Sequence, residues 1–181
     1  MIRSKHISIY DLCIMAVFTA IIAVMAQIVI PLPYGVPLTL QTLAISLAGV
    51  ILGAKKGTLS VVVYVLIGAV GAPVFAGFTG GFGIVFGPTG GFILSFPLLA
   101  LAAGIGAEKN SKSRLWVGLV VGVMTNYLCG VVYYSIVTSN DLLTSFVACV
   151  LLFIPTDILK ITAAGLLGIK LRGLLLQRGV V

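Results

Sequence analysis

Long apolar runs without a charged side chain constrain this chain more than any other feature of its sequence. The run that follows Asp11 and continues to Ile30 is long enough to cross a bilayer whose hydrocarbon core is about 30 Å thick. Hydrophobic residues make up 60% of the chain and charged residues 8%, whereas a typical soluble domain is about 25% charged. Because the runs lack the alternation of barrel strands, the sequence predicts an all-α integral membrane protein that lies almost entirely in the bilayer.

Breaks between the apolar runs predict six membrane-spanning helices within one domain over residues 1–181. We expect these helices at about 11–30, 39–53, 58–70, 90–107, 115–137 and 155–172. Three prolines within 31–37 end the first helix, because proline removes a backbone N–H and clashes with the preceding turn. Gly53 to Gly57 is expected to form a tight basic turn between the second and third helices.

The stretch from Leu142 to Gln177 contains too many residues for one ordinary span. Its single proline, Pro155, suits the first turn of a helix, where no backbone N–H is needed. We therefore expect a short helix over about 142–153 and a sixth spanning helix that begins near Pro155.

Lysine and arginine residues predict which side of the membrane each end of the chain faces. Apart from Lys160, they all fall on one side of the six-helix arrangement: Arg3, Lys5, Lys55, Lys56, Lys109, Lys112, Arg114, Lys170, Arg172 and Arg178. The opposite loops, 31–38, 73–88 and 138–141, contain none. The positive-inside rule therefore predicts cytoplasmic termini. This placement accounts for the net charge of +7, so we expect a lipid bilayer and no nucleic acid as the partner of these charges.

Asp157 and Lys160 place an acid and a base three residues apart within an otherwise apolar stretch. On a helix this spacing puts both side chains on one face, and Pro155 puts Asp157 in the first turn, where the helix dipole favours a carboxylate. Ionisable side chains inside a membrane are costly and usually face a cavity, a partner or a ligand. The alternative interpretation is a neutralised pair that only fixes helix packing.

Other candidate binding residues lie in segments that should meet this pair near the outer surface. Thr39, Gln41 and Thr42 bring hydrogen-bonding groups to the start of the second helix, with Thr39 and Gln41 as candidate ligand contacts, although helix capping explains them equally well. Residues 68–91 interleave glycines with phenylalanines, and we interpret them as a structured lid over a pocket, with Phe75, Gly77 and Gly81 as candidate ligand contacts. Tyr127 on the fifth helix could line the same pocket or lie at the membrane interface. Together these features predict an outward-facing pocket for a small molecule.

The sequence offers a pocket but no evident catalytic apparatus. It contains no nucleotide-binding motif, and Cys13, Cys129, Cys149 and His6 lack metal-ligand spacing, so we expect no metal and no cofactor. No internal repeat of the kind found in secondary transporters is evident. A substrate-capturing subunit powered by partner proteins fits best. A membrane enzyme that uses Asp157 and Lys160 as general acid and base is the alternative from another class.

Several motifs resemble the BioY family, the biotin-specific substrate-binding (S) subunits of energy-coupling-factor transporters, and they occur in the family's order. They are Val36–Thr42, Gly71–Gly77, Gly80–Gly81, Gly87–Phe92 and Pro155–Lys160. The chain departs from the family pattern at Thr156, where glycine is often found, and at Tyr133-Tyr134, where a tryptophan-containing pattern is common.

The resemblance implies a six-helix S-component fold, a location in the bacterial cell membrane and high-affinity uptake of biotin. It implies a transmembrane coupling subunit and two cytoplasmic ATPase subunits as partners, with ATP used only by those partners. Ala16 and Ala20 lie four residues apart on the first helix and correspond to the family's alanine motif, which docks the coupling subunit.

The resemblance also gives Asp157 and Lys160 a ligand. Side chains three apart on a helix lie too close together to reach both ends of biotin, so we expect both to contact the ureido ring, with the tail carboxylate on Thr39 or on loop N–H groups. The competing assignment places Lys160 on the tail carboxylate. An S component for thiamine or riboflavin is the alternative within the same class of transporter.

Overall fold

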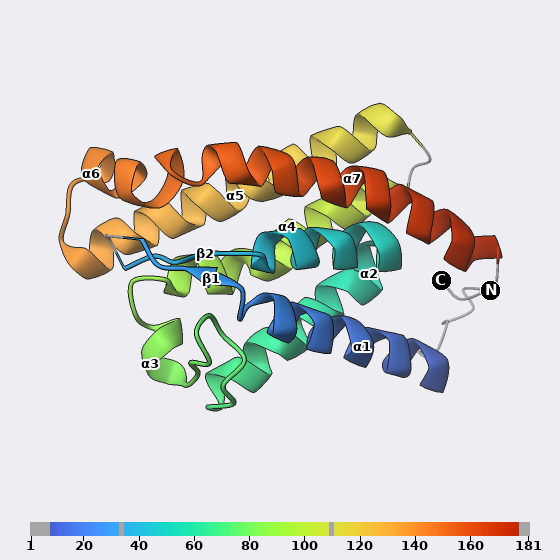
Figure 1. The fold of residues 1–181 in the computed structure, drawn as a ribbon, viewed down its shortest axis with the longest axis horizontal. Helices are drawn as coiled ribbons and strands as arrows, with labels where there is room; N and C mark the ends of the chain where they lie inside the picture. Colours follow the sequence, from blue (N-terminus) through green and yellow to red (C-terminus); the bar gives the residue numbers. More distant parts are fainter. Residues whose placement is uncertain (1–7, 33–34, 109–110, 178–181) are drawn as a thin grey trace, which may run out of the picture.

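The computed structural model describes residues 8–32, 35–108 and 111–177, and helices make up most of them (Figure 1). In chain order the elements are α1 (Ile9–Met25), β1 (Val29–Ile30), β2 (Leu38–Thr39), α2 (Gln41–Ala69), α3 (Phe82–Val85), α4 (Gly90–Glu108), α5 (Lys112–Thr138), α6 (Leu142–Phe146), the π-helical turn η1 (Val147–Leu151) and α7 (Ile154–Gln177). The prediction of a mostly helical membrane protein is confirmed. The predictions made for Arg3, Lys5, His6, Lys109 and Arg178 concern positions outside the described residues.

Three of the described helices, α2, α4 and α5, are each long and apolar enough to cross a membrane. A fourth span results if α6 with η1 and α7 are counted as one helix bent by 48°. The helix α1 is also apolar but has only 17 residues. Length and composition therefore give three or four spans, and the six-helix arrangement stays a prediction.

The long helix α2 is two helical arms joined at Gly53. The backbone of this residue has φ 84° and ψ 177°, a conformation that is accessible in practice only to glycine. After the turn the second arm runs back along the first (Figure 1), and Gly57 packs directly against Ala48 and Gly49. The prediction of a five-residue turn over 53–57 is wrong, because only Gly53 leaves the helical conformation and Lys55 already belongs to the second arm.

Side chains from two other helices satisfy the backbone groups that this turn leaves open. Arg172 of α7 donates to the carbonyl oxygens of Val50 and Ile51, each at 3.1 Å, at the end of the first arm. Glu108 of α4 accepts from the N–H of Ala54 at 2.8 Å, at the start of the second arm. Such groups have no partner within their own helix, so these two contacts stabilise the hairpin and tie α4 and α7 to it.

The α2 hairpin lies at the centre of the helix packing. Its largest interface is with α4, which packs on its other side against α5, while α1 and α7 also pack on α2. The main apolar core therefore lies where α2, α4 and α5 meet and includes Ile45, Tyr64, Phe96, Leu99 and Val123.

A short β-hairpin connects α1 to α2, and the sequence did not predict it. Val29 pairs with Thr39 and Ile30 with Leu38 in an antiparallel register. Consequently α1 ends at Met25 instead of near residue 30, and α2 begins at Gln41 instead of at Thr39.

The predicted start of the last helix near Pro155 is confirmed, because α7 begins at Ile154 and has Pro155 in its first turn. The preceding segment differs from the expected helix over 142–153. It is α-helical only to Phe146 and continues as a π-helical turn to Leu151. The helix α7 also extends to Gln177, beyond the predicted end near residue 172.

Candidate functional site

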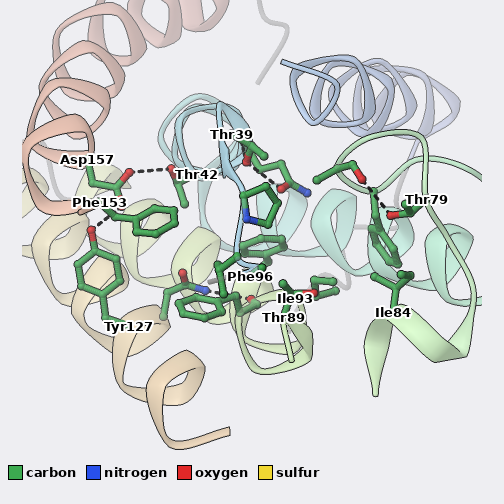
Figure 2. Close-up of a pocket in the computed structure, with 18 of the residues that line it drawn as sticks. Thr39, Thr42, Thr79, Ile84, Thr89, Ile93, Phe96, Tyr127, Phe153 and Asp157 are labelled. Carbon is green, nitrogen blue, oxygen red and sulfur yellow. Dashed lines mark hydrogen bonds between the residues drawn. The ribbon is translucent and has the colours of Figure 1, made fainter. Parts of the chain in front are cut away.

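A cavity of about 240 Å³ lies between the start of α2, the β-hairpin connection, the loop that joins α2 to α4, and the helices α4, α5 and α7. Figure 2 shows it in close-up. The residues that line it are Gly35, Val36, Pro37, Thr39, Gln41, Thr42, Phe75, Ala76, Thr79, Ile84, Thr89, Phe92, Ile93, Phe96, Asn126, Tyr127, Phe153, Asp157 and Lys160. Most of this lining is apolar or aromatic, with a few polar groups, as is usual for small-molecule sites.

One end of the cavity carries the buried ion pair of α7. The ammonium of Lys160 lies 2.7 Å from Oδ1 of Asp157, and the two side chains are 7% and 4% exposed. The same Oδ1 accepts from the hydroxyl of Thr42 on α2 at 3.2 Å, and Oδ2 accepts from the hydroxyl of Tyr127 on α5 at 2.5 Å. One carboxylate therefore joins three helices at the cavity wall, and its charge is neutralised by a neighbour one turn along.

The hydrogen-bonding capacity of the pair is divided unequally. A carboxylate offers about four acceptor positions. In Asp157, three of these positions already accept hydrogen bonds from Thr42, Tyr127 and Lys160. An ammonium has three donors, and within the described part of the chain Lys160 spends one of them, on Asp157. Because Lys160 lines the cavity, its remaining donors are available to a ligand oxygen. This end of the cavity suits a ligand with a carbonyl or carboxylate group and, beside it, one N–H donor.

A second cluster of polar side chains lies at the start of α2 and consists of Thr39, Gln41 and Tyr64. Thr39 donates to the side-chain oxygen of Gln41 at 2.9 Å, and the Gln41 amide donates to the hydroxyl of Tyr64 at 2.7 Å. Tyr64 in turn donates to the carbonyl of Val74 at 3.0 Å. These bonds form a buried chain from the cavity wall to the loop that covers it, which is more than the capping of α2.

Apolar side chains line the cavity between the polar groups. In Figure 2, Phe96 and Ile93 lie between the Asp157 end and the residues Thr79 and Ile84 at the other end. Asn126 is buried beside them and donates to the carbonyl of Phe92 at 3.0 Å. The cavity can therefore hold a molecule with a polar head and an apolar body.

The loop between α2 and α4 forms an ordered cover over the cavity. The amide of Phe75 donates to the carbonyl of Thr79 at 2.9 Å, and the amide of Gly81 donates to the carbonyl of Gly68 at 2.7 Å. The Phe75 side chain is only 1% exposed and lines the cavity. This geometry agrees with the interpretation of a structured lid.

Comparison with known proteins gives a family for this fold and cavity. The model of the BioY family matches residues 2–177. The chain belongs to the BioY family. It is 39% identical over 163 residues to the probable biotin transporter BioY of Pyrococcus horikoshii, and this match covers 90% of this chain and 96% of the relative. It is 38% identical over 163 residues to the biotin transporter BioY of Thermotoga maritima, covering 90% of this chain and 95% of that relative.

A solved structure is similar over the same extent. It is the crystal structure of the S-component for biotin from an ECF-type ABC transporter, with a TM-score of 0.81 and 30% sequence identity. The match covers 90% of this chain and 90% of that one. The BioY-family chain described here therefore has the fold of an ECF S component.

The structure brings together six of the candidate ligand contacts from the sequence of this BioY-family member. Thr39, Gln41, Phe75, Tyr127, Asp157 and Lys160 all line the cavity. Gly77 and Gly81 do not line it. Both have positive φ, 69° and 96°, and they shape the loop that carries Phe75.

Four polar residues that line the cavity were absent from the candidate ligand contacts: Thr42, Thr79, Thr89 and Asn126. Thr42 follows Gln41 directly, but its contact with α7 joins positions 115 residues apart, which no local pattern reveals. Asn126 precedes Tyr127, and an amide side chain within an apolar run was the signal available in the sequence; the structure shows that this amide is buried.

The remaining candidates are Ala16 and Ala20, which lie on an exposed face of α1. Neither lines the cavity. Among the described residues there is no group of three His, Cys, Asp or Glu side chains placed to hold a metal ion.

Proposed function

We propose that this BioY-family protein captures biotin at the outer face of the cytoplasmic membrane, as the S component of an ECF-type ABC transporter. The observation that carries the proposal is the cavity, in which the Asp157–Lys160 pair meets an apolar, aromatic wall. Biotin has matching chemistry, with a polar ureido ring fused to an apolar ring and a carboxylate at the end of an aliphatic tail. Relatives of nearly the full length of this chain are named as biotin transporters.

The division of hydrogen bonds within the pair favours the ureido ring as its ligand group. Asp157 has about one acceptor position left, which suits a single ureido N–H. Lys160 has donors to spare, which suit the ureido carbonyl next to that N–H. The tail carboxylate would then reach the lid or the β-hairpin connection, where loop N–H groups and the Thr39 hydroxyl are the available donors.

The six-crossing topology is part of this proposal. The crossings would be α1, the two arms of α2, α4, α5 and α7, which places both termini in the cytoplasm. Lys55, Lys56, Lys112, Arg114 and Arg172 would then lie at the cytoplasmic ends of the helices, as the positive-inside rule requires. Lys56 supports the close packing of α1 with the second arm of α2 at that end, because its ammonium lies 2.7 Å from Oδ1 of Asp11.

The same proposal assigns the energy source to partner proteins. A transmembrane coupling subunit would dock on the exposed Ala16–Ala20 face of α1, and two cytoplasmic ATPase subunits would hydrolyse ATP. The chain itself belongs to a transporter family and is not an enzyme. It would use no cofactor, with biotin as the transported ligand.

Calorimetric titration of the purified, ligand-stripped protein with biotin tests the proposal, with thiamine and riboflavin as controls. We expect tight one-to-one binding of biotin and none of the two controls. Binding of thiamine or riboflavin alone would assign the protein to another vitamin. Mass spectrometry of the released ligand completes the test, since recovery of unchanged biotin is expected and a converted product would indicate an enzyme.

A further inference from the structure

The side chain of Gln27, which lies just beyond the end of α1, holds the loop that covers the cavity. Its amide nitrogen donates to the carbonyl of Phe75 at 3.2 Å and to that of Val74 at 3.4 Å. Its amide oxygen accepts from the N–H of Phe78 at 2.7 Å. The nitrogen also donates to Ala23 within α1 at 2.8 Å, so the side chain is anchored at its base.

The loop needs such support because its turn is not intrinsically favourable. Phe78 has φ 57°, in the left-handed region that residues with a Cβ rarely adopt. Its side chain is exposed and provides little packing there. A conformation of this kind persists only when surrounding contacts impose it, and the bond from its N–H to Gln27 is the shortest hydrogen bond that holds this turn.

Gln27 acts on the cavity through Phe75. Phe75 lines the cavity, and its ring packs edge-to-face on Tyr64 with centroids 5.6 Å apart. The Phe75 carbonyl accepts from Gln27, and the preceding Val74 carbonyl accepts both from Gln27 and, at 3.0 Å, from the Tyr64 hydroxyl. Gln27 itself does not line the cavity.

We propose that Gln27 is a positioning residue for ligand retention: it clasps the 74–78 segment so that Phe75 stays closed over the bound molecule. This proposal rests on the proposed function for the identity of the ligand. The geometry of the clasp itself is independent of that identity. Gln27 would slow the escape of the ligand without touching it.

Three substitutions test the clasp. Gln27→Met keeps a side chain of similar length and removes every hydrogen bond, whereas Gln27→Glu keeps an acceptor for Phe78 and removes the donors to Phe75 and Val74. Ile28→Ala is the matched control, because Ile28 is the next residue and its side chain is exposed. All are purified at full length and reconstituted in lipid nanodiscs.

The first measurement is the rate at which labelled biotin leaves the protein, together with the number of binding sites per molecule. For Gln27→Met we expect one site per molecule and a dissociation rate about tenfold higher, the size expected from losing one or two ordinary hydrogen bonds. Gln27→Glu should also release biotin faster, and Ile28→Ala should match the wild type. A wild-type dissociation rate in both Gln27 variants overturns the proposal.

The second measurement needs no ligand, so it also tests the clasp in a variant that folds but does not bind biotin. Amide hydrogen exchange of the segment 74–79 in the ligand-free protein should be faster in Gln27→Met than in Ile28→Ala. Unchanged exchange there overturns the clasp, even if binding is lost. If the wild-type protein does not bind biotin at all, the proposed function fails, and the exchange measurement still decides the role of Gln27.

Discussion

The hydroxyl of Tyr127 on α5 donates to Oδ2 of Asp157 on α7 at 2.5 Å and thereby joins two helices that otherwise share only a small interface. Thr42 of α2 bonds the other oxygen of the same carboxylate, next to the ammonium of Lys160. Asp157 therefore has two tasks at once. It holds three helices together at the cavity wall, and it orients the lysine that lines the cavity.

Replacing Asp157 by asparagine should abolish tight biotin binding. The change removes the charge that neutralises buried Lys160, and an unpaired buried charge typically costs about 3–5 kcal/mol. We expect a lower unfolding temperature and no calorimetric signal for biotin. Adding Lys160→Met to the Asp157→Asn variant should restore the unfolding temperature but not binding, whereas retained affinity in Asp157→Asn would place the ligand site elsewhere.

Replacing Tyr127 by phenylalanine should have a smaller effect, because the ring stays and only the hydroxyl is lost. A hydrogen bond to a charged group is worth about 1.5–3 kcal/mol, so we expect biotin to bind roughly ten- to a hundredfold more weakly in titrations. Tyr133→Phe is the matched control, since Tyr133 lies on the same helix and does not line this cavity. Equal affinities for the two variants would contradict a role for Tyr127 in orienting Asp157.

Biotin methyl ester distinguishes the two possible orientations of the ligand, because it keeps the ureido head and loses the charge of the tail. If Lys160 contacts the ureido carbonyl, Lys160→Ala should weaken binding of biotin and of its ester by the same factor. The loss of stability in this variant affects both titrations equally and cancels in their ratio. A variant that binds biotin more weakly but the ester normally would assign Lys160 to the tail carboxylate.

Sequence reasoning succeeded where a feature depends on neighbouring residues. The apolar runs predicted the helices, and Pro155 predicted the start of α7, because chain length across a bilayer and the missing N–H of proline are local properties. The spacing of Asp157 and Lys160 placed them on one face, and their side chains do form an ion pair in the cavity wall.

Sequence reasoning failed where contacts between distant segments determine the local structure. The β-hairpin of Val29–Ile30 with Leu38–Thr39 is too short to show a strand pattern. The turn in α2 is confined to Gly53 because Glu108 and Arg172, from two other helices, satisfy its open backbone groups. Glycine composition alone also did not separate residues that line the cavity from Gly77 and Gly81, which only shape the lid.

Replacing Gly53 by alanine should lower stability without altering the ligand site. The backbone at Gly53 has φ 84° and ψ 177°, and holding a residue with a Cβ in such a region costs about 1–3 kcal/mol. The new Cβ would also lie 2.6 Å from Oε1 of Glu108, which would have to move. We expect a lower unfolding temperature and unchanged biotin stoichiometry, with Gly173→Ala in open space on α7 as the control. An unfolding temperature equal to that of the wild type would show that the hairpin tolerates a different turn.

Tryptophan at Ala16 and Ala20 together should block biotin uptake while leaving biotin binding intact. Both alanines are exposed on α1, and neither lines the cavity, so bulky side chains there have room in the isolated protein. Small residues four apart allow a partner helix to approach closely, and two indole rings would prevent that approach.

The measurement is uptake of biotin by cells that also express the coupling subunit and ATPases, paired with titration of the purified variant. Leu128→Trp, at an exposed position of α5, is the control for adding tryptophan to a helix surface. Loss of binding in the double variant would assign the alanines to internal packing, and normal uptake would move the docking surface away from this face of α1.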